Sequence, residues 1–185
     1  MNPTTLSGLI WIGFILYWSA AARGSAPSLS SESAASRQIH VLLMYGALAL
    51  AFIRVPLLTG RWLPKTTAVL VAGFAVQLGS FALAAWARGH LGRNWSAAIA
   101  SKAEHRLVRS GPYRLVRHPI YSAMLGMFLG TALISGTVHA LLALVVMSAA
   151  YVRKIRLEER MLEEVFGTDY EAYRHEVRAV IPWVL

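Results

Sequence analysis

The residues best suited to chemistry lie in the second half of the chain. The first group is a run of histidine, arginine and tyrosine side chains, and the second is a carboxylate pair, Glu158-Glu159. The run reads His105-Arg106-Leu107-Val108, then Gly111-Pro112-Tyr113, then Arg117-His118-Pro119-Ile120-Tyr121. Histidine and tyrosine side chains both donate and accept hydrogen bonds, and a carboxylate can hold a cation. Together these groups predict a site for a polar, positively charged small molecule.

The spacing within the last part of the run predicts how it is held. Pro119 has no amide hydrogen and a fixed φ, so it suits the first turn of a helix, with His118 at the helix start. Tyr121 lies three residues further on, close to the same face. Glu158 is expected near the end of a later helix on the same side of the molecule. His118 and Tyr121 are the candidate catalytic residues.

The composition indicates what kind of elements position these groups. Of the 185 residues, 56% are hydrophobic and only 15% are charged, and the mean hydropathy is +0.50. An ordinary soluble domain carries about 25% charged residues. The net charge of +9 comes from basic residues that flank apolar runs, which favours membrane interfaces over nucleic acid. The absence of cysteine excludes disulfides and a cysteine nucleophile, and no His-Glu-x-x-His spacing indicates a metal.

Four or five apolar stretches are candidates for membrane helices. Three cover residues 6–22, 39–53 and 66–87, and residues 118–152 contain no Asp, Glu, Lys or Arg. A turn at Ser135-Gly136-Thr137 would fold the last stretch into a helical hairpin. The sequence thus predicts an all-α integral membrane protein of about five transmembrane helices. Its single domain would comprise three helices (1–87), a cytoplasmic loop (88–118), the hairpin (119–152) and cytoplasmic helices (153–185).

Charge sets the expected orientation. Thirteen of the eighteen Lys and Arg residues lie in 88–117 or after Tyr151, and positive residues favour the cytoplasm. The N-terminus is then outside, and the cofactor pocket is cytoplasmic, formed by the loop before the fourth helix and the C-terminal helices. Residues 153–166 predict an amphipathic helix that ends at Gly167, followed by a capping box of Thr168 and Glu171. Three acidic residues are expected on a solvated face, and two tyrosines are expected to pack. The acidic residues are Glu159, Glu163 and Glu164, and the tyrosines are Tyr170 and Tyr173.

The ordered motifs resemble a known family. The pattern is His-x-Leu-Val-x-x-Gly-x-Tyr-x-x-x-Arg-His-Pro-x-Tyr, followed by Glu-Glu and then Phe-Gly-x-x-Tyr-x-x-Tyr. It resembles the isoprenylcysteine carboxyl methyltransferases, in particular short prokaryotic members that are also similar to phospholipid N-methyltransferases. The resemblance covers about residues 105–182. It implies S-adenosyl-L-methionine as the cofactor and a prokaryotic inner membrane as the location.

The resemblance also implies roles for individual residues. The implied cofactor contacts are His105, Arg106, Leu107, Val108, Tyr113, His118, Pro119, Ile120, Tyr121 and Glu158. In the family, a basic residue four positions before the matched glutamate holds the substrate carboxylate. This position is Lys154, where eukaryotic members have arginine. Lysine is a point charge without the two-pronged fork of arginine, so Arg156 is expected to share or replace that role.

The implied reaction is methyl transfer to a lipophilic acceptor that enters from the bilayer. The acceptor is expected to be the carboxylate of an isoprenylcysteine-like, isoprenoid or lipid molecule. Membrane lipids are the other expected partners, with no nucleic acid and no metal. The alternatives are an N- or S-methyltransferase for phospholipids or small molecules, an NADPH-dependent membrane reductase, and a non-enzymatic scaffold that binds anionic lipid.

Overall fold

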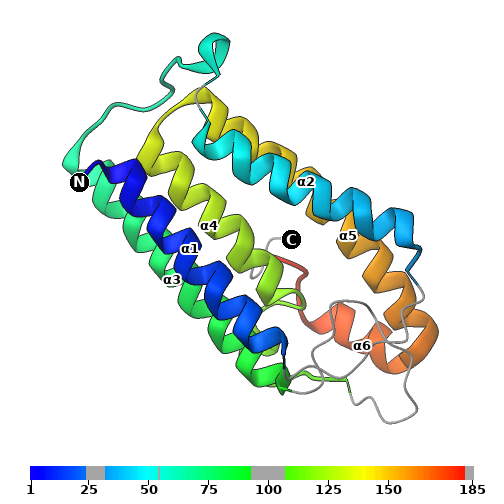
Figure 1. Cartoon of the computed structure of the whole chain (residues 1–185). Helices are drawn as coiled ribbons and strands as arrows, with labels where there is room; N and C mark the ends of the chain where they lie inside the picture. The colour runs from blue at the N-terminus through cyan, green and yellow to red at the C-terminus, as the bar shows by residue number, and fades with distance from the viewer. Residues whose placement is uncertain (24–31, 54, 93–106, 182–185) are drawn as a thin grey trace.

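The computed structural model describes residues 1–23, 32–53, 55–92 and 107–181. These residues form helices and turns, with one isolated β-bridge and no β-strand among them (Figure 1). The helices are α1 (Pro3–Ala22), α2 (Ala34–Phe52), α3 (Thr67–Leu91), α4 (Pro119–Ser135), α5 (Val138–Phe166) and α6 (Thr168–Glu176), with short 3₁₀ turns η1 (Pro56–Leu58) and η3 (Gly111–Arg114). The all-α prediction is confirmed.

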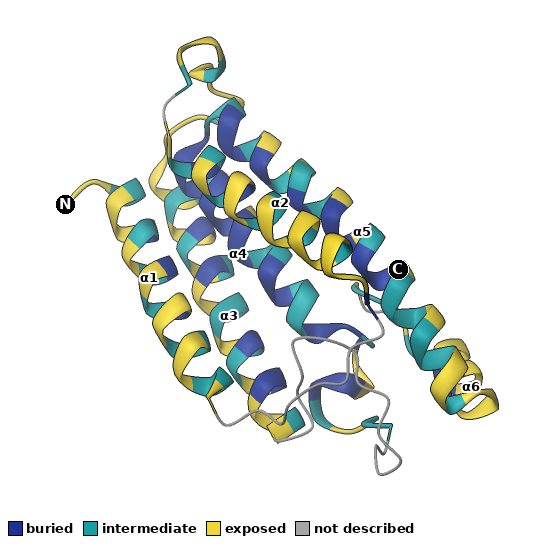
Figure 2. Ribbon diagram, turned by 45° about the vertical axis from the view of Figure 1, so that its right-hand side comes forward, coloured by how far each residue is buried: buried dark blue, intermediate teal, exposed yellow. Residues whose placement is uncertain are grey.

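Four of the described helices are long and apolar enough to cross a membrane: α1, α2, α3 and α5. The fourth helix in chain order, α4, is also apolar but has only 17 residues. Large apolar side chains such as Leu16, Leu42 and Val71 are exposed along α1, α2 and α3. Figure 2 shows exposed residues along the outer sides of these helices. Helices that are apolar on their outer faces as well as their inner faces are typical of membrane spans.

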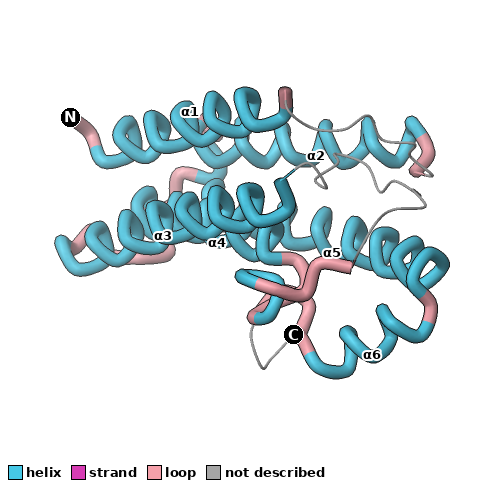
Figure 3. Tube along the Cα trace, turned by 90° about the horizontal axis from the view of Figure 1, so that it is seen from below, coloured by secondary structure: helices cyan, strands magenta, loops and turns pink. Residues whose placement is uncertain are grey.

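The helices form two groups that run roughly alongside each other (Figures 1 and 3). In one group α3 packs along α4, with α1 in contact with both, and in the other α2 packs along α5. The two groups are joined by the turn between α4 and α5. Gly136 in this turn has a φ of +63°, a left-handed conformation that glycine adopts without strain. The predicted hairpin turn at residues 135–137 is therefore confirmed.

Three glycines allow α3 and α4 to approach closely. A Cβ at Gly130 would lie 2.8 Å from both the amide nitrogen of Gln77 and the carbonyl oxygen of Gly73. A Cβ at Gly126 would meet Ser80, and one at Gly73 would meet Ile134 at 2.7 Å. Membrane helices lack a hydrophobic force that draws them together, so small residues at the contact allow the packing that holds them.

We expect Gly130→Ala to destabilise the protein, because its Cβ would meet the Cβ and amide nitrogen of Gln77 and the carbonyl oxygen of Gly73, and none of these atoms can move without the helix backbone. Overpacking of this kind costs roughly 1–3 kcal/mol, and thermal unfolding of the purified protein in detergent measures it. Gly79→Ala is the matched control, since a Cβ at that α3 position meets nothing within 4 Å. An equal melting temperature for Gly130→Ala and the parent would contradict this account of the α3–α4 contact.

The sequence predicted that the helical hairpin ends at residue 152 and that a separate helix begins at residue 153, and the structure differs. Helix α5 continues unbroken from Val138 to Phe166, so the hairpin arm and the expected amphipathic helix are one element. It ends at Gly167, which has a φ of +51°, as predicted. The capping box is wrong: Gly167 is also the N-cap of α6, and no side chain caps that helix. Because the connection is a single residue, Thr168 already lies within α6.

Candidate functional site

The turn that precedes α4 is held by the end of the chain. His118 is the N-cap of α4 and Pro119 its first residue, as the sequence predicts. The backbone N–H groups of Arg117 and His118 donate to the carbonyls of Arg178 and Ala179, at 2.8 and 2.9 Å. The segment that follows α6 thus lies against the start of α4 and fixes the direction in which the His118 side chain points.

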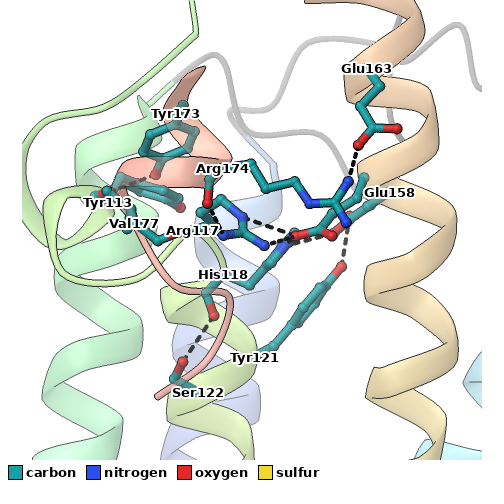
Figure 4. A network of polar contacts seen from close by, with 11 residues as sticks. Tyr113, Arg117, His118, Tyr121, Ser122, Glu158, Glu163, Tyr173, Arg174 and Val177 are labelled. Atoms are coloured by element: carbon teal, nitrogen blue, oxygen red, sulfur yellow. Dashed lines mark hydrogen bonds and ion pairs between the residues drawn. The ribbon is translucent and has the colours of Figure 1, made fainter. Parts of the chain in front are cut away.

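Glu158 of α5 meets His118 and Tyr121 across this turn (Figure 4). The Tyr121 hydroxyl donates to Glu158 Oε1 at 2.7 Å, and His118 Nδ1 lies 3.4 Å from Glu158 Oε2. The rings of His118 and Tyr121 stack with centroids 5.5 Å apart. Both carboxylate oxygens are therefore oriented, and the side chain of Glu158 retains 19% exposure.

Two opposing influences act on the pKa of His118. Burial alone would lower it, but hydrogen bonds to Glu158 and Glu159 outweigh the burial and raise it above the ordinary histidine value. His118 therefore holds its proton more tightly than a solvated histidine does. In this state the imidazole stabilises the two neighbouring carboxylates.

The prediction that Glu159 lies on a solvated face is wrong. Its Oε1 accepts from Arg117 Nε at 3.0 Å and Nη2 at 2.5 Å, and it lies 3.3 Å from His118 Nε2. The Arg117 guanidinium also donates to the carbonyls of Arg174 and Val177. The reason is geometric: α5 approaches the start of α4 closely enough for two consecutive carboxylates to face it. The sequence signal for this role was Arg117, directly before His118, because an arginine next to the site requires a carboxylate to balance its charge.

A cavity of about 540 Å³ opens beside these groups. The predicted site residues that line it are Leu107, Val108, Tyr113, His118, Pro119, Ile120, Tyr121, Lys154 and Glu158. His105 and Arg106 lie outside the described residues. Arg156 is exposed and does not line the cavity. The structure thus brings together the described residues of the expected cofactor set and leaves Arg156 apart from them.

The N-terminal helices supply walls that the sequence did not reveal. The cavity is lined by Trp11, Phe14, Ile15 and Trp18 of α1 and by His40, Val41, Met44 and Tyr45 of α2. The apolar pattern of these helices is the same whether they face lipid or ligand, so it carried no signal of this role. The cavity consequently has one polar part, around Glu158, and one apolar part between α1 and α2.

The tyrosines of α6 close the polar part. Tyr170 and Tyr173 are buried, which confirms their predicted packing role, and both also line the cavity. The Tyr173 hydroxyl donates to the Tyr113 carbonyl at 2.6 Å and so holds η3 in place. The Tyr113 hydroxyl itself is buried and makes no hydrogen bond within the described part of the chain. A buried donor without a protein partner is well suited to a bound ligand.

Lys154 lies on the cavity wall, but its ammonium pairs with Glu32, which precedes α2. The side chains of Lys154 and Glu32 are only 7% and 2% exposed. The other oxygen of Glu32 accepts from the Ser36 hydroxyl at 2.8 Å. An ion pair between α5 and the start of α2 therefore closes one side of the site.

Comparisons with known proteins agree with this architecture. Residues 68–169 match the family model described as phospholipid methyltransferase. The protein-S-isoprenylcysteine O-methyltransferase of Schizosaccharomyces pombe is 32% identical over 186 residues, covering 96% of this chain and 74% of that protein. Isoprenylcysteine O-methyltransferase A of Arabidopsis thaliana is 34% identical, covering 50% of this chain and 49% of that protein. Methanethiol S-methyltransferase 1 of Bradyrhizobium diazoefficiens is 38% identical, covering 38% and 24%.

A solved structure shares the fold. The eukaryotic intramembrane Ras methyltransferase, an isoprenylcysteine carboxyl methyltransferase, superposes with a TM-score of 0.53 at 20% identity, covering 83% of this chain and 54% of that one. The chain thus spans about three quarters of its fission-yeast relative and about half of the plant relative and of this structure. The fold and these matches define an integral membrane methyltransferase. The chain belongs to the phospholipid methyltransferase family, which includes the isoprenylcysteine carboxyl methyltransferases.

Proposed function

We propose that this protein transfers a methyl group from S-adenosyl-L-methionine to the carboxylate of a lipophilic acceptor, such as an isoprenylcysteine-like or isoprenoid molecule. The observation that carries the proposal is the oriented carboxylate of Glu158 on the wall of a cavity that continues as an apolar space between α1 and α2. A cationic donor would use the polar part, and a hydrocarbon tail the apolar part.

The residues present fit the cofactor. S-Adenosylmethionine carries a sulfonium and an ammonium, and Glu158 offers a carboxylate with both oxygens oriented. The buried hydroxyl of Tyr113 is available as a donor, and Leu107, Val108 and Ile120 give an apolar surface for a flat base. The cavity volume lies within the range of roughly 300–1,000 Å³ that is typical of small-molecule sites.

The protein's part in the reaction is positioning. When bound, the cofactor supplies a methyl group activated by its positive sulfur. A carboxylate acceptor is already ionised at neutral pH, since carboxylic acids have pKa values near 4, so no general base is required. His118 and Tyr121 orient Glu158, and the buried tyrosines of α6 limit access of water. Alignment and removal of water then account for the rate.

The matches to the phospholipid methyltransferase model and to a methanethiol S-methyltransferase make nitrogen or sulfur acceptors the second candidate. Such an acceptor loses a proton during the reaction and needs a base. Among the described residues, His118 lies beside Glu158, and its contacts with Glu158 and Glu159 hold its proton in place, so His118 would have to give up these contacts to act as that base. A carboxylate acceptor requires no such proton transfer and is therefore favoured.

Calorimetry on the purified protein in detergent tests the cofactor. We expect S-adenosylhomocysteine to bind and NADPH not to bind. Transfer of a radiolabelled methyl group to N-acetyl-S-farnesyl-L-cysteine tests the acceptor. Binding of NADPH alone would identify a reductase instead, and binding of neither would favour a scaffold for anionic lipid.

The same proposal includes an orientation, with the N-terminus outside and the site in the cytoplasm. Two contacts lie at the end of the helices that carries the site: Arg88 donates to the Ala21 carbonyl, and Lys154 pairs with Glu32. At the opposite end, the Val138 N–H donates to the Gly60 carbonyl. The chain has no native cysteine, so single cysteines report cleanly. In intact cells we expect an impermeant thiol reagent to label Thr59→Cys and not Glu176→Cys. The reverse pattern would invert the topology.

A further inference from the structure

We propose that Arg37 of α2 holds the carboxylate of the acceptor, and that Lys154 does not. The inference rests on the proposed function, since it concerns the acceptor of the same site. It follows from three observations: the charge of Lys154 is already matched, Arg37 lies on the cavity wall without a side-chain partner among the described residues, and the face of α2 that carries Arg37 is linked to Glu158.

The ion pair of Lys154 is an internal one. Both of its side chains are almost fully buried, and Ser36 satisfies the second oxygen of Glu32. Ser36 in turn accepts from Arg153 Nη2 at 2.7 Å, so two consecutive residues of α5 anchor the start of α2. Loss of one partner from a buried ion pair leaves the other charge uncompensated and is strongly unfavourable. An acceptor carboxylate that replaced Glu32 on Lys154 would leave Glu32 buried without its counter-charge.

Arg37 is differently placed. It is exposed yet lines the cavity, so it lies at the cavity mouth. Its guanidinium makes no hydrogen bond or ion pair with the described residues, whereas Arg117, the other arginine on this wall, is matched by Glu159. Arginine binds a carboxylate through two parallel hydrogen bonds, which a lysine cannot do. Arg37 therefore supplies the fork that position 154 lacks.

A chain of aromatic rings connects this face of α2 to the cofactor part of the cavity. His40 lies one turn beyond Arg37, and its ring centroid is 5.4 Å from that of Tyr151. The ring of Tyr151 stacks on that of Tyr121 at 4.6 Å, and Tyr121 donates to Glu158. Arg37 and Glu158 therefore line the same cavity and are connected through side chains that also line it, so a carboxylate near Arg37 lies in the space that the cofactor part shares.

The test compares the binding of a charged probe with that of its uncharged counterpart. The charged probe is N-acetyl-S-farnesyl-L-cysteine, and the uncharged one is its carboxamide. Calorimetry in the presence of S-adenosylhomocysteine measures binding with no turnover. We expect the parent to bind the acid about tenfold more tightly than the amide, the equivalent of one strong charge-assisted contact. Arg37→Gln should remove this preference and leave binding of the amide unchanged.

Two further variants make the test specific. Arg156→Gln removes an arginine that is exposed and away from the cavity, so it should keep the tenfold preference. The double change Glu32→Gln with Lys154→Gln keeps a hydrogen-bonded pair without the charges, and it should also keep the preference. Loss of the preference in the double variant but not in Arg37→Gln would assign the carboxylate to Lys154 and overturn the inference.

A parent protein without acid preference would also overturn the inference. Failure of the proposed function is a separate result, because it would appear as absent methyl transfer to the acid in a turnover assay.

Discussion

Replacement of Glu158 by glutamine is expected to weaken the binding of S-adenosylmethionine by about ten- to a hundredfold. The change keeps the size and most hydrogen bonding of the side chain but removes the negative charge that would face the sulfonium or ammonium. A charge-assisted hydrogen bond in a partly buried site contributes roughly 1.5–3 kcal/mol. Calorimetric titration of the purified variant measures the affinity directly.

The matched control is Glu164→Gln on the same helix. Glu164 is exposed and does not line the cavity, so its substitution removes the same charge from the same helix outside the site. Its affinity for the cofactor should equal that of the parent. If Glu158→Gln binds the cofactor as tightly as Glu164→Gln does, Glu158 does not contact the cofactor.

Replacement of Glu159 by glutamine is expected to cost about 3 kcal/mol of stability, together with most of the activity. Its side chain is 13% exposed and that of Arg117 is 7%, and loss of one member of a buried pair typically costs 3–5 kcal/mol. The loss of stability extends beyond the pair, because the Arg117 guanidinium also donates to the carbonyls of Arg174 and Val177 at the end of α6. For a chain of this length the melting temperature should fall by roughly 6–12 °C.

The ion pair between Glu163 and Arg174 provides the comparison. It also involves a carboxylate of α5, but it joins α5 to α6, and its side chains are 40% and 52% exposed. Exposed pairs contribute about 0–1 kcal/mol, so Glu163→Gln should shift the melting temperature by no more than a few degrees. Equal shifts for the two variants would show that Glu159 has only a surface role.

The parts of the fold that could be predicted are those that depend on local sequence. The apolar stretches predicted the long helices. Gly136 and Gly167 indicated where α4 and α5 end, and Pro119 indicated where α4 begins. The continuity of α5 was missed because charge begins at Arg153, and the change of composition resembles a boundary. A helix that leaves a membrane changes its surface without changing its backbone.

The site was predictable where its residues are close in sequence. His118 and Tyr121 were placed correctly because one helical turn separates them. The contacts of Glu159 and Glu32, and the place of Arg37 on the cavity wall, depend on which helices become neighbours, and residue spacing contains no such information. The pairing of α2 with α5 brought Glu32 to Lys154, and no local motif announces that pairing.

The unbroken α5 links the chemistry to the thickness of the membrane. Its 29 residues extend about 43 Å at 1.5 Å per residue, well beyond a hydrocarbon core of about 30 Å. The lipid-facing half and the half that carries Glu158 and Glu159 are one rod, so they tilt together. A helix adjusts its tilt when the bilayer becomes thinner or thicker. Any change of tilt in response to the bilayer would therefore move Glu158 and Glu159 together with the lipid-facing half of α5, and acyl-chain length would reach the site through this helix.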